Sequence, residues 1–259
     1  MKTSYFIIAF YFTLSTLNAQ SADELNKQSK ELIAKQDYKN ALPILRKAAE
    51  QGSAEAQYNL GYFLSAGVGT NRNVVEGIKW YRLSSENGFN DGHYAMMMAY
   101  GNGEGVQQNS AVAFQYAIKC ANNNDPTCIW NVVTCYATGM GVNKNEGLFK
   151  TWIFKLAKLE NPENLAQSGY ITSARLELAK YYLIGNHFPV DLYQSYLWYI
   201  IYNENKVDFS ILKQDEVIKE IKELEKSLSS KQLETAKKDA ENLIGRDLRN
   251  FDQLYKNTL

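Results

Sequence analysis

The sequence predicts an all-α fold, an α–α superhelix in which antiparallel helix pairs stack into a solenoid with a charged helical cap at its C-terminal end. Three observations predict it: a repeat of 36 residues, apolar residues at helical spacing within each repeat, and glycine-containing turns between the helices. One helix pair of this length cannot bury its apolar face alone, so the repeats must stack to form a continuous core.

The composition of the 259-residue chain is that of an ordinary folded protein, with 45% apolar and 22% charged residues. Its 28 basic residues balance 28 acidic ones, which argues against a nucleic-acid binder with a concentrated basic face. The two histidines and three cysteines do not favour a metal site, so we predict neither a metal nor another cofactor.

The first 19 residues predict a secretory signal peptide. Lys2 precedes an apolar run from Tyr5 to Leu17, and Ala19 is the small residue that a cleavage site needs. This run is shorter than the roughly 18–20 residues of a membrane-spanning helix, and no cysteine follows it for a lipid anchor. We therefore expect cleavage after Ala19, export to the bacterial periplasm or out of the cell, and no transmembrane segment in the mature chain.

The repeat is visible when the segment from Ala56 onwards is compared with the residues 36 and 72 positions later. A pair of turn glycines recurs at Gly67 and Gly69, Gly103 and Gly105, and Gly139 and Gly141. A short polar residue suited to cap the second helix recurs at Asp37, Asn73, Asn109, Asn145 and Asp191. One large aromatic position recurs at Trp80, Tyr116, Trp152 and Trp198, and we expect these side chains to fill equivalent slots in the core.

This register divides the chain into a signal peptide, five repeats and a cap. The signal peptide is 1–19, the repeats cover about 20–53, 54–89, 90–125, 126–171 and 172–203, and the charged C-terminal helices cover 204–259. The last repeat follows a shift of 118 residues, which is three periods plus ten. We expect the ten extra residues to form an inserted loop or short helix between Trp152 and Ser173, where Asn161-Pro162 and Gly169 interrupt the pattern.

Residues 37 to 203 resemble a known family in their motifs. The pattern Ala56-x-x-x-Leu60-Gly61, Gly67-x-Gly69, Asn73-x-x-Glu76-Gly77-x-x-Trp80-Tyr81 is similar to the Sel1-like repeat (SLR), a relative of the tetratricopeptide repeat. Met97 departs from this pattern at the position of Gly61, and His187 departs from it at the second turn glycine. The resemblance implies an interaction scaffold that has no chemistry of its own and binds a protein or peptide partner, and we expect it to be monomeric.

The cysteines lie around one junction between repeats. Cys120 should end one helix and Cys128 should begin the next, and two such helices can bring the cysteines within disulfide distance in an oxidising compartment. The C-x7-C spacing also resembles the cysteine-rich secreted branch of the family. We predict a Cys120–Cys128 bond and interpret Cys135 as a buried free thiol.

The first helices supply candidate partner-binding residues if they line the concave face, as they do in tetratricopeptide arrays. The stripe consists of Glu55, Tyr58 and Tyr62, then Asp91, Tyr94 and Met98, then Trp130 and Thr134, then Leu176 and Lys180. Tyr58, Tyr94 and Trp130 are each 36 residues apart and should form an aromatic ladder in a peptide-binding groove. The alternative is that these rings pack against neighbouring helices.

The C-terminal segment differs from the repeats, since its last 55 residues hold 22 of the 56 charges. Val217, Ile221 and Leu224 keep an apolar helical stripe, and Ser229 with Gln232 predicts a capping box at a further helix start. We interpret these helices as the terminal cap of the solenoid, and the alternative is a partner-binding coiled coil.

The motifs of common enzyme classes are missing from the sequence, and we predict no catalytic residues. Ser210-x-x-Lys213 matches one element of the β-lactamase pattern, but the accompanying Ser-Asp-Asn and Lys-Thr-Gly elements are absent. The cysteine-rich branch nevertheless leaves a β-lactam-binding or β-lactam-hydrolysing protein open as an alternative function. A surface protein that meets the cell wall or a host is another.

The export prediction has a direct test. In cells that secrete through this type of signal, the mature protein should begin at Gln20, because Ala19 is the small residue before the cleavage point. N-terminal sequencing of the protein recovered from the periplasm or medium measures this. Recovery of the chain with Lys2 still attached would contradict the prediction.

Overall fold

The computed structural model describes residues 20–160, 165–204, 214–248 and 251–255. The predicted signal peptide, the Asn161-Pro162 step and the Ser210–Lys213 motif lie outside these residues. In the described residues the chain forms twelve α-helices and one 3₁₀ helix, Phe251–Gln253. The α-helices are α1 (Ala22–Ala34), α2 (Tyr38–Glu50), α3 (Ala54–Ala66), α4 (Val74–Glu86), α5 (Asn90–Asn102), α6 (Ser110–Asn122), α7 (Pro126–Thr138), α8 (Glu146–Lys158), α9 (Leu165–Ile184), α10 (Leu192–Asn203), α11 (Gln214–Ser227) and α12 (Ser230–Ile244).

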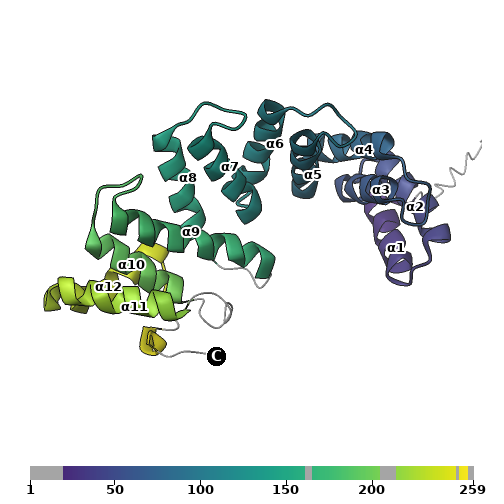
Figure 1. Cartoon of the computed structure of the whole chain (residues 1–259). Coiled ribbons are helices and arrows are strands. Elements are labelled where there is room, and N and C mark those ends of the chain that lie inside the picture. Colours follow the sequence, from purple (N-terminus) through teal and green to yellow (C-terminus); the bar gives the residue numbers. More distant parts are fainter. Residues whose placement is uncertain (1–19, 161–164, 205–213, 249–250, 256–259) are drawn as a thin grey trace, which may run out of the picture.

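The helices pack in sequential pairs that follow one another along an arc (Figure 1). From α1 to α10, each helix packs against the next one along the chain. The first helices of neighbouring pairs also touch, α3 against α5 and α7 against α9, so these helices lie on the inner side of the arc. The predicted fold class, an all-helical repeat solenoid, is confirmed.

Short polar residues begin the second helix of each pair, as the sequence predicts. Each of these side chains accepts a hydrogen bond from the backbone N–H three residues later, which satisfies a donor of the first helical turn. The caps are Asp37, Asn73, Asn109, Asn145 and Asp191. The first helices end at Gly67, Gly103 and Gly139, which adopt the left-handed conformation that stops a helix.

The turn between the two helices of a unit also packs against the preceding unit. The second glycine of each turn lies against the first residue of the second helix in the unit before it. The pairs are Gly69 with Tyr38 of α2, Gly105 with Val74 of α4, and Gly141 with Ser110 of α6. At Gly141, where φ is +72°, a Cβ atom would overlap the carbonyl oxygen of Ser110. In the last unit His187 occupies this position with φ 62°, and its Nδ1 lies 3.1 Å from both carboxylate oxygens of Glu146, the first residue of α8.

The repeated aromatic position is not equivalent in every unit, contrary to the sequence prediction. Trp198 is completely buried, whereas Trp80, Tyr116 and Trp152 are only half-buried. The difference follows from the neighbours of α10, because this helix packs against α9, α11 and α12. Every residue from Ser195 to Asn203 is consequently buried, while the second helices of earlier units keep an exposed side.

The ten extra residues mainly lengthen a helix, where the sequence predicted an inserted loop or a separate short helix. The repeat register would start α9 at Thr172, but the helix begins at Leu165, so it carries seven additional residues. The other three lie in the connection from α8, which spans 159–164. This extension places Tyr170 against Trp130, with their ring centroids 6.1 Å apart.

The charged C-terminal helices pack on the last repeat. Val217, Ile221 and Leu224 of α11 are buried, and α12 begins with the capping box formed by Ser229 and Gln232. An ion pair also connects the two parts, because the buried Glu204 at the end of α10 pairs with the partly exposed Arg246, which follows α12. No helix among the described residues is long and apolar enough to cross a bilayer.

The glycine contact between units predicts a specific loss of stability. Gly141→Ala should lower the free energy of unfolding by more than about 2 kcal/mol, because the left-handed backbone alone costs an L residue roughly 1–2 kcal/mol and the overlap with Ser110 adds to it. Urea unfolding followed by circular dichroism measures the loss.

Gly52→Ala is the matched control, since Gly52 also has a positive φ of +94° but has open space around its Cβ position. We expect this variant to lose only the conformational contribution. Equal losses in the two variants would show that the approach of Gly141 to Ser110 does not constrain the fold.

Candidate functional site

The inner face of the arc contains a pocket of about 290 Å³ between α3 and α5. Four of the predicted partner-binding residues line it together: Tyr58 and Tyr62 from α3, and Tyr94 and Met98 from α5. Tyr62 and Met98 are 50% and 40% exposed, so their side chains are available to a partner. Val74, Ile78 and Tyr81 of α4 provide the remaining apolar wall, and Glu104 lies at the edge.

A second pocket of about 400 Å³ lies one repeat further along, between α5 and α7. Nine of its lining residues are the 36-residue counterparts of residues in the first pocket. The pairs are Tyr62 and Met98, Ser65 and Gly101, Ala66 and Asn102, Val74 and Ser110, Ile78 and Phe114, Tyr81 and Ala117, Ala95 and Asn131, Ala99 and Cys135, and Glu104 and Met140. Met98 lines both pockets and forms the wall between them.

A third hollow, of about 480 Å³, precedes these two between α1 and α3. Its lining is charged and includes Asp23, Lys27, Lys30 and Glu55, with Lys30 Nζ 2.5 Å from Glu55 Oε1. The inner face therefore changes along the chain from a charged hollow to a tyrosine-lined pocket and then to a pocket with cysteine and methionine in its walls.

The tyrosines of the first pocket are held by ring contacts. Tyr58 packs against Tyr81 and Phe89, with centroid distances of 5.6 and 5.7 Å. Burial raises the pKa of Tyr58 and of Tyr94, and it raises the pKa of Tyr81 to about 12. All three phenols are consequently neutral at physiological pH and can donate hydrogen bonds to a bound group.

Asp91 is exposed on α5 and lies outside the lining of the first pocket, but it is close enough to Tyr58 to raise the pKa of that phenol. Partial burial raises the pKa of the Asp91 carboxyl, and the neighbouring Asp125 and Glu55 raise it further. Glu55 is paired with Lys30, and Asp125 accepts hydrogen bonds from the Cys128 N–H and from Asn90. Asp91 forms no ion pair within the described part of the chain, so a basic group of a partner would find its negative charge unneutralised.

The structure does not bring the other predicted partner-binding residues into these pockets. Trp130 and Thr134 on α7 and Lys180 on α9 are half-buried and line neither one. Trp130 packs against Tyr170, and Thr134 donates a hydrogen bond to the Trp130 carbonyl over 3.0 Å. For Trp130, packing against a neighbouring helix is therefore the arrangement that the structure shows.

Cys135 and Met140 line the second pocket, although neither belongs to the predicted partner-binding residues. The sequence predicts Cys135 to be a buried free thiol, whereas the structure shows it half-buried in the pocket wall. Met140 lies in the turn after α7, outside the predicted helical stripe. The signal that finds both is the repeat register itself, because it maps Ala99 to Cys135 and Glu104 to Met140.

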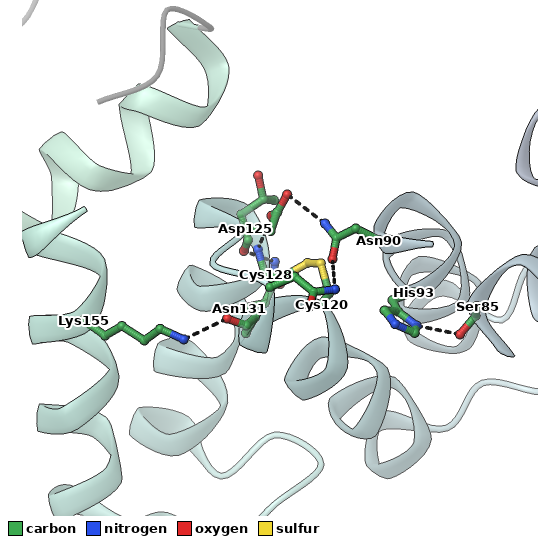
Figure 2. The surroundings of a disulfide bond; sticks show 11 residues. Ser85, Asn90, His93, Cys120, Asp125, Cys128, Asn131 and Lys155 are labelled. Atoms are coloured by element: carbon green, nitrogen blue, oxygen red, sulfur yellow. Dashed lines mark hydrogen bonds between the residues drawn. A yellow bond between two sulfur atoms is a disulfide. The ribbon is translucent and has the colours of Figure 1, made fainter. Parts of the chain in front are cut away.

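The predicted disulfide joins α6 to α7 (Figure 2). The Cα atoms of Cys120 and Cys128 are 5.7 Å apart, and both side chains are fully buried. Asn90 at the start of α5 donates a hydrogen bond to Asp125 and accepts one from Asn123, which connects three helix ends around the bond. The disulfide thereby links α6 and α7, two helices that contribute lining residues to the second pocket.

Comparison with known proteins finds a match to one repeat family. The family model described as Sel1 repeat matches residues 31–53, 54–89, 92–125 and 172–201. A segment of 45 residues is 47% identical to the chitin synthase regulator SKT5 of Malassezia restricta, and it covers 17% of this chain. The chain matches only 3% of the length of that protein.

One solved structure supports the same fold, and a second belongs to a similar chain. The crystal structure of a Sel1 repeat protein from Oxalobacter formigenes is 26% identical, with a TM-score of 0.63, and the match covers 87% of this chain and 91% of that one. A protective antigen with an SLR fold from uropathogenic Escherichia coli is 21% identical, with a TM-score of 0.44, and the match covers 90% of this chain and 55% of that one.

Reduction of the Cys120–Cys128 bond should lower the free energy of unfolding by about 2–3 kcal/mol, because it releases a short closed loop in the unfolded chain. Urea unfolding of the Cys135→Ser variant, with and without reductant, isolates this effect from the free thiol. An unchanged transition midpoint would contradict the expected stabilisation. Peptide mapping of the original chain that found Cys128 joined to Cys135 would contradict the pairing.

Proposed function

We propose, from the premise that this chain is a Sel1-like repeat protein and a repeat scaffold, that it binds an extended segment of a partner protein along the inner face of its arc. The observation that supports this most directly is the pair of equivalent pockets one repeat apart, which share Met98 as their common wall. An extended chain that lies across the first helices can place one side chain in each pocket. The proposal assigns the protein no chemistry of its own.

The side chains on this face suit a binding surface energetically. Tyrosine buries a large area while losing few rotamers, and it is enriched among the residues that dominate binding energies. Methionine adapts its shape to different apolar groups. Tyr62 and Met98 present these properties from neighbouring helices at the mouth of the first pocket.

Charge and polarity indicate which residues of the partner would enter. The tyrosine rings favour a basic side chain at the first pocket through cation–π contact, and the negative charge of Asp91 near Tyr58 adds to this preference. Phe114, Met98 and Met140 favour an apolar side chain at the second pocket. The partner segment that we propose therefore carries a lysine or arginine followed by an apolar residue.

The cellular setting belongs to the same proposal. The signal-like sequence of residues 1–19 and the disulfide both suit an oxidising compartment, so we place the interaction in the periplasm or outside the cell. The partner would accordingly be an exported protein.

Site-specific crosslinking tests the proposed groove. A photoreactive phenylalanine analogue at Tyr62 or at Tyr94 should capture the same partner in the producing cells, since both positions line the first pocket. The matched control carries the analogue at Gln115, which is exposed on α6 and outside both pockets. Mass spectrometry identifies the captured segment, and its affinity for the purified chain should fall about tenfold or more in Tyr62→Ala.

Two outcomes would contradict the proposal that this groove binds a partner. One is equal capture of the same partner from Gln115, and the other is an unchanged affinity in both Tyr62→Ala and Met98→Ala. Because Tyr62 is half exposed, its truncation removes little of the core and leaves the helices intact.

A further inference from the structure

The second pocket, between α5 and α7, is lined by most of the sulfur-containing side chains that are not part of the disulfide. The sequence contains five methionines and three cysteines, and two of these cysteines form the disulfide. Apart from Met1, five sulfur side chains remain, and four of them line this one pocket: Met97, Met98, Cys135 and Met140. The fifth, Met96, is fully buried in a separate core cluster with Ile78 and Ala99.

The repeat does not require sulfur at these positions. In the tyrosine-lined pocket the counterparts of Met98, Cys135 and Met140 are Tyr62, Ala99 and Glu104. Met98 and Met140 are also 40% and 59% exposed, whereas Met97 is buried at the inner side. The sulfur-containing side chains therefore come from three places, α5, α7 and the turn after α7, and belong to residues that line a cavity that solvent can reach.

We propose that this sulfur-rich pocket binds a soft monovalent metal ion of the Cu(I) and Ag(I) class. Thiolate and thioether sulfur are the ligands that select Cu(I) over hard cations. Cys135 would supply the thiolate, Met98 and Met140 the thioethers at the mouth, and Met97 a further thioether at the inner wall.

The walls of the pocket suit such an ion. Ala113, Phe114 and Ala117 form an apolar side, and the polar lining residues are neutral amides and a serine, with no carboxylate or imidazole among the residues described there. Hard divalent ions prefer charged oxygen ligands. A univalent cation held by one thiolate makes a neutral complex, which is compatible with a partly apolar cavity.

Binding at Cys135 has a defined proton balance. Burial raises the pKa of this thiol, so it carries its proton in the free protein at neutral pH. The S–H bond breaks, a sulfur–metal bond forms, and one proton goes to solvent for each ion bound, with no change of oxidation state. The other group of possible metal ligands in the described residues, Cys120, Asp125 and Cys128, has both of its sulfurs in the disulfide.

Titration with Ag⁺ in chloride-free buffer tests the site without a reductant, so the disulfide stays intact. The chain from Gln20 onwards should bind one Ag⁺ and release one proton, as measured by calorimetry in buffers of different ionisation enthalpy. Bound Ag⁺ should protect Cys135 from alkylation by N-ethylmaleimide. Anaerobic competition with a Cu(I) chelator then extends the measurement to Cu(I).

Variants distinguish Ag⁺ binding by several sulfur ligands from binding by the Cys135 thiol alone. Loss of a residue that merely supports a metal ligand weakens metal binding by about 10–100-fold, so Cys135→Ser and the double variant Met98→Leu/Met140→Leu should each weaken Ag⁺ binding at least about tenfold. Met96→Leu is the matched control, because Met96 belongs to the same run of methionines but lies outside the pocket. Circular dichroism confirms that each variant is folded.

Unchanged affinity in the methionine double variant would overturn the proposal, because the thiol alone would then account for binding. An equal loss in Met96→Leu would overturn it as well. A bound ion and an apolar side chain of the proposed partner would compete for this pocket, whereas the tyrosine-lined pocket contains no cysteine and is tested separately by crosslinking at Tyr62.

Discussion

The close approach between each turn and the preceding unit is the constraint on which the arc depends. Gly69, Gly105 and Gly141 lie against the first residue of the preceding second helix, and an ordinary side chain there would push the units apart. Because the contact repeats every 36 residues, the units stack with similar geometry, and equivalent pockets open between their first helices. His187 meets the same requirement differently, since its ring reaches Glu146 and packs at a tilt against Phe149 at a centroid distance of 4.3 Å.

Much of the fold could be predicted from the sequence because its signals are local. Helix caps such as Asn73 and turn glycines such as Gly67 act on backbone within a few residues, so the sequence is sufficient to place them. The Cys120–Cys128 pair is local too, as it spans one helix junction. The burial of Trp198 depends instead on α11 and α12, and the contact of Trp130 depends on the extra turns of α9. Those contacts join distant parts of the chain, and a repeat register contains no information about them.

The candidate site could likewise be predicted only in part, because the repeat predicts the backbone around each pocket but not which side chains line it. The register correctly relates the residues of one pocket to those of the next, but it does not say which members of a helical stripe share a pocket. Tyr58, Tyr62, Tyr94 and Met98 do so, because α3 touches α5 directly. With the backbone nearly constant, the chemistry of each hollow is set by the substitutions that the repeat tolerates, such as Glu104 in one unit and Met140 in the next.

The lengthened helix α9 has a consequence for the size of any ligand on the inner face. Tyr170 lies against Trp130 and close enough to Tyr94 to influence its pKa. The helical extension therefore brings an additional aromatic ring to α7 at this end of the arc. In the proposed binding mode, the extension would limit how far a bound segment could continue past α7, so the proposed partner segment would be short.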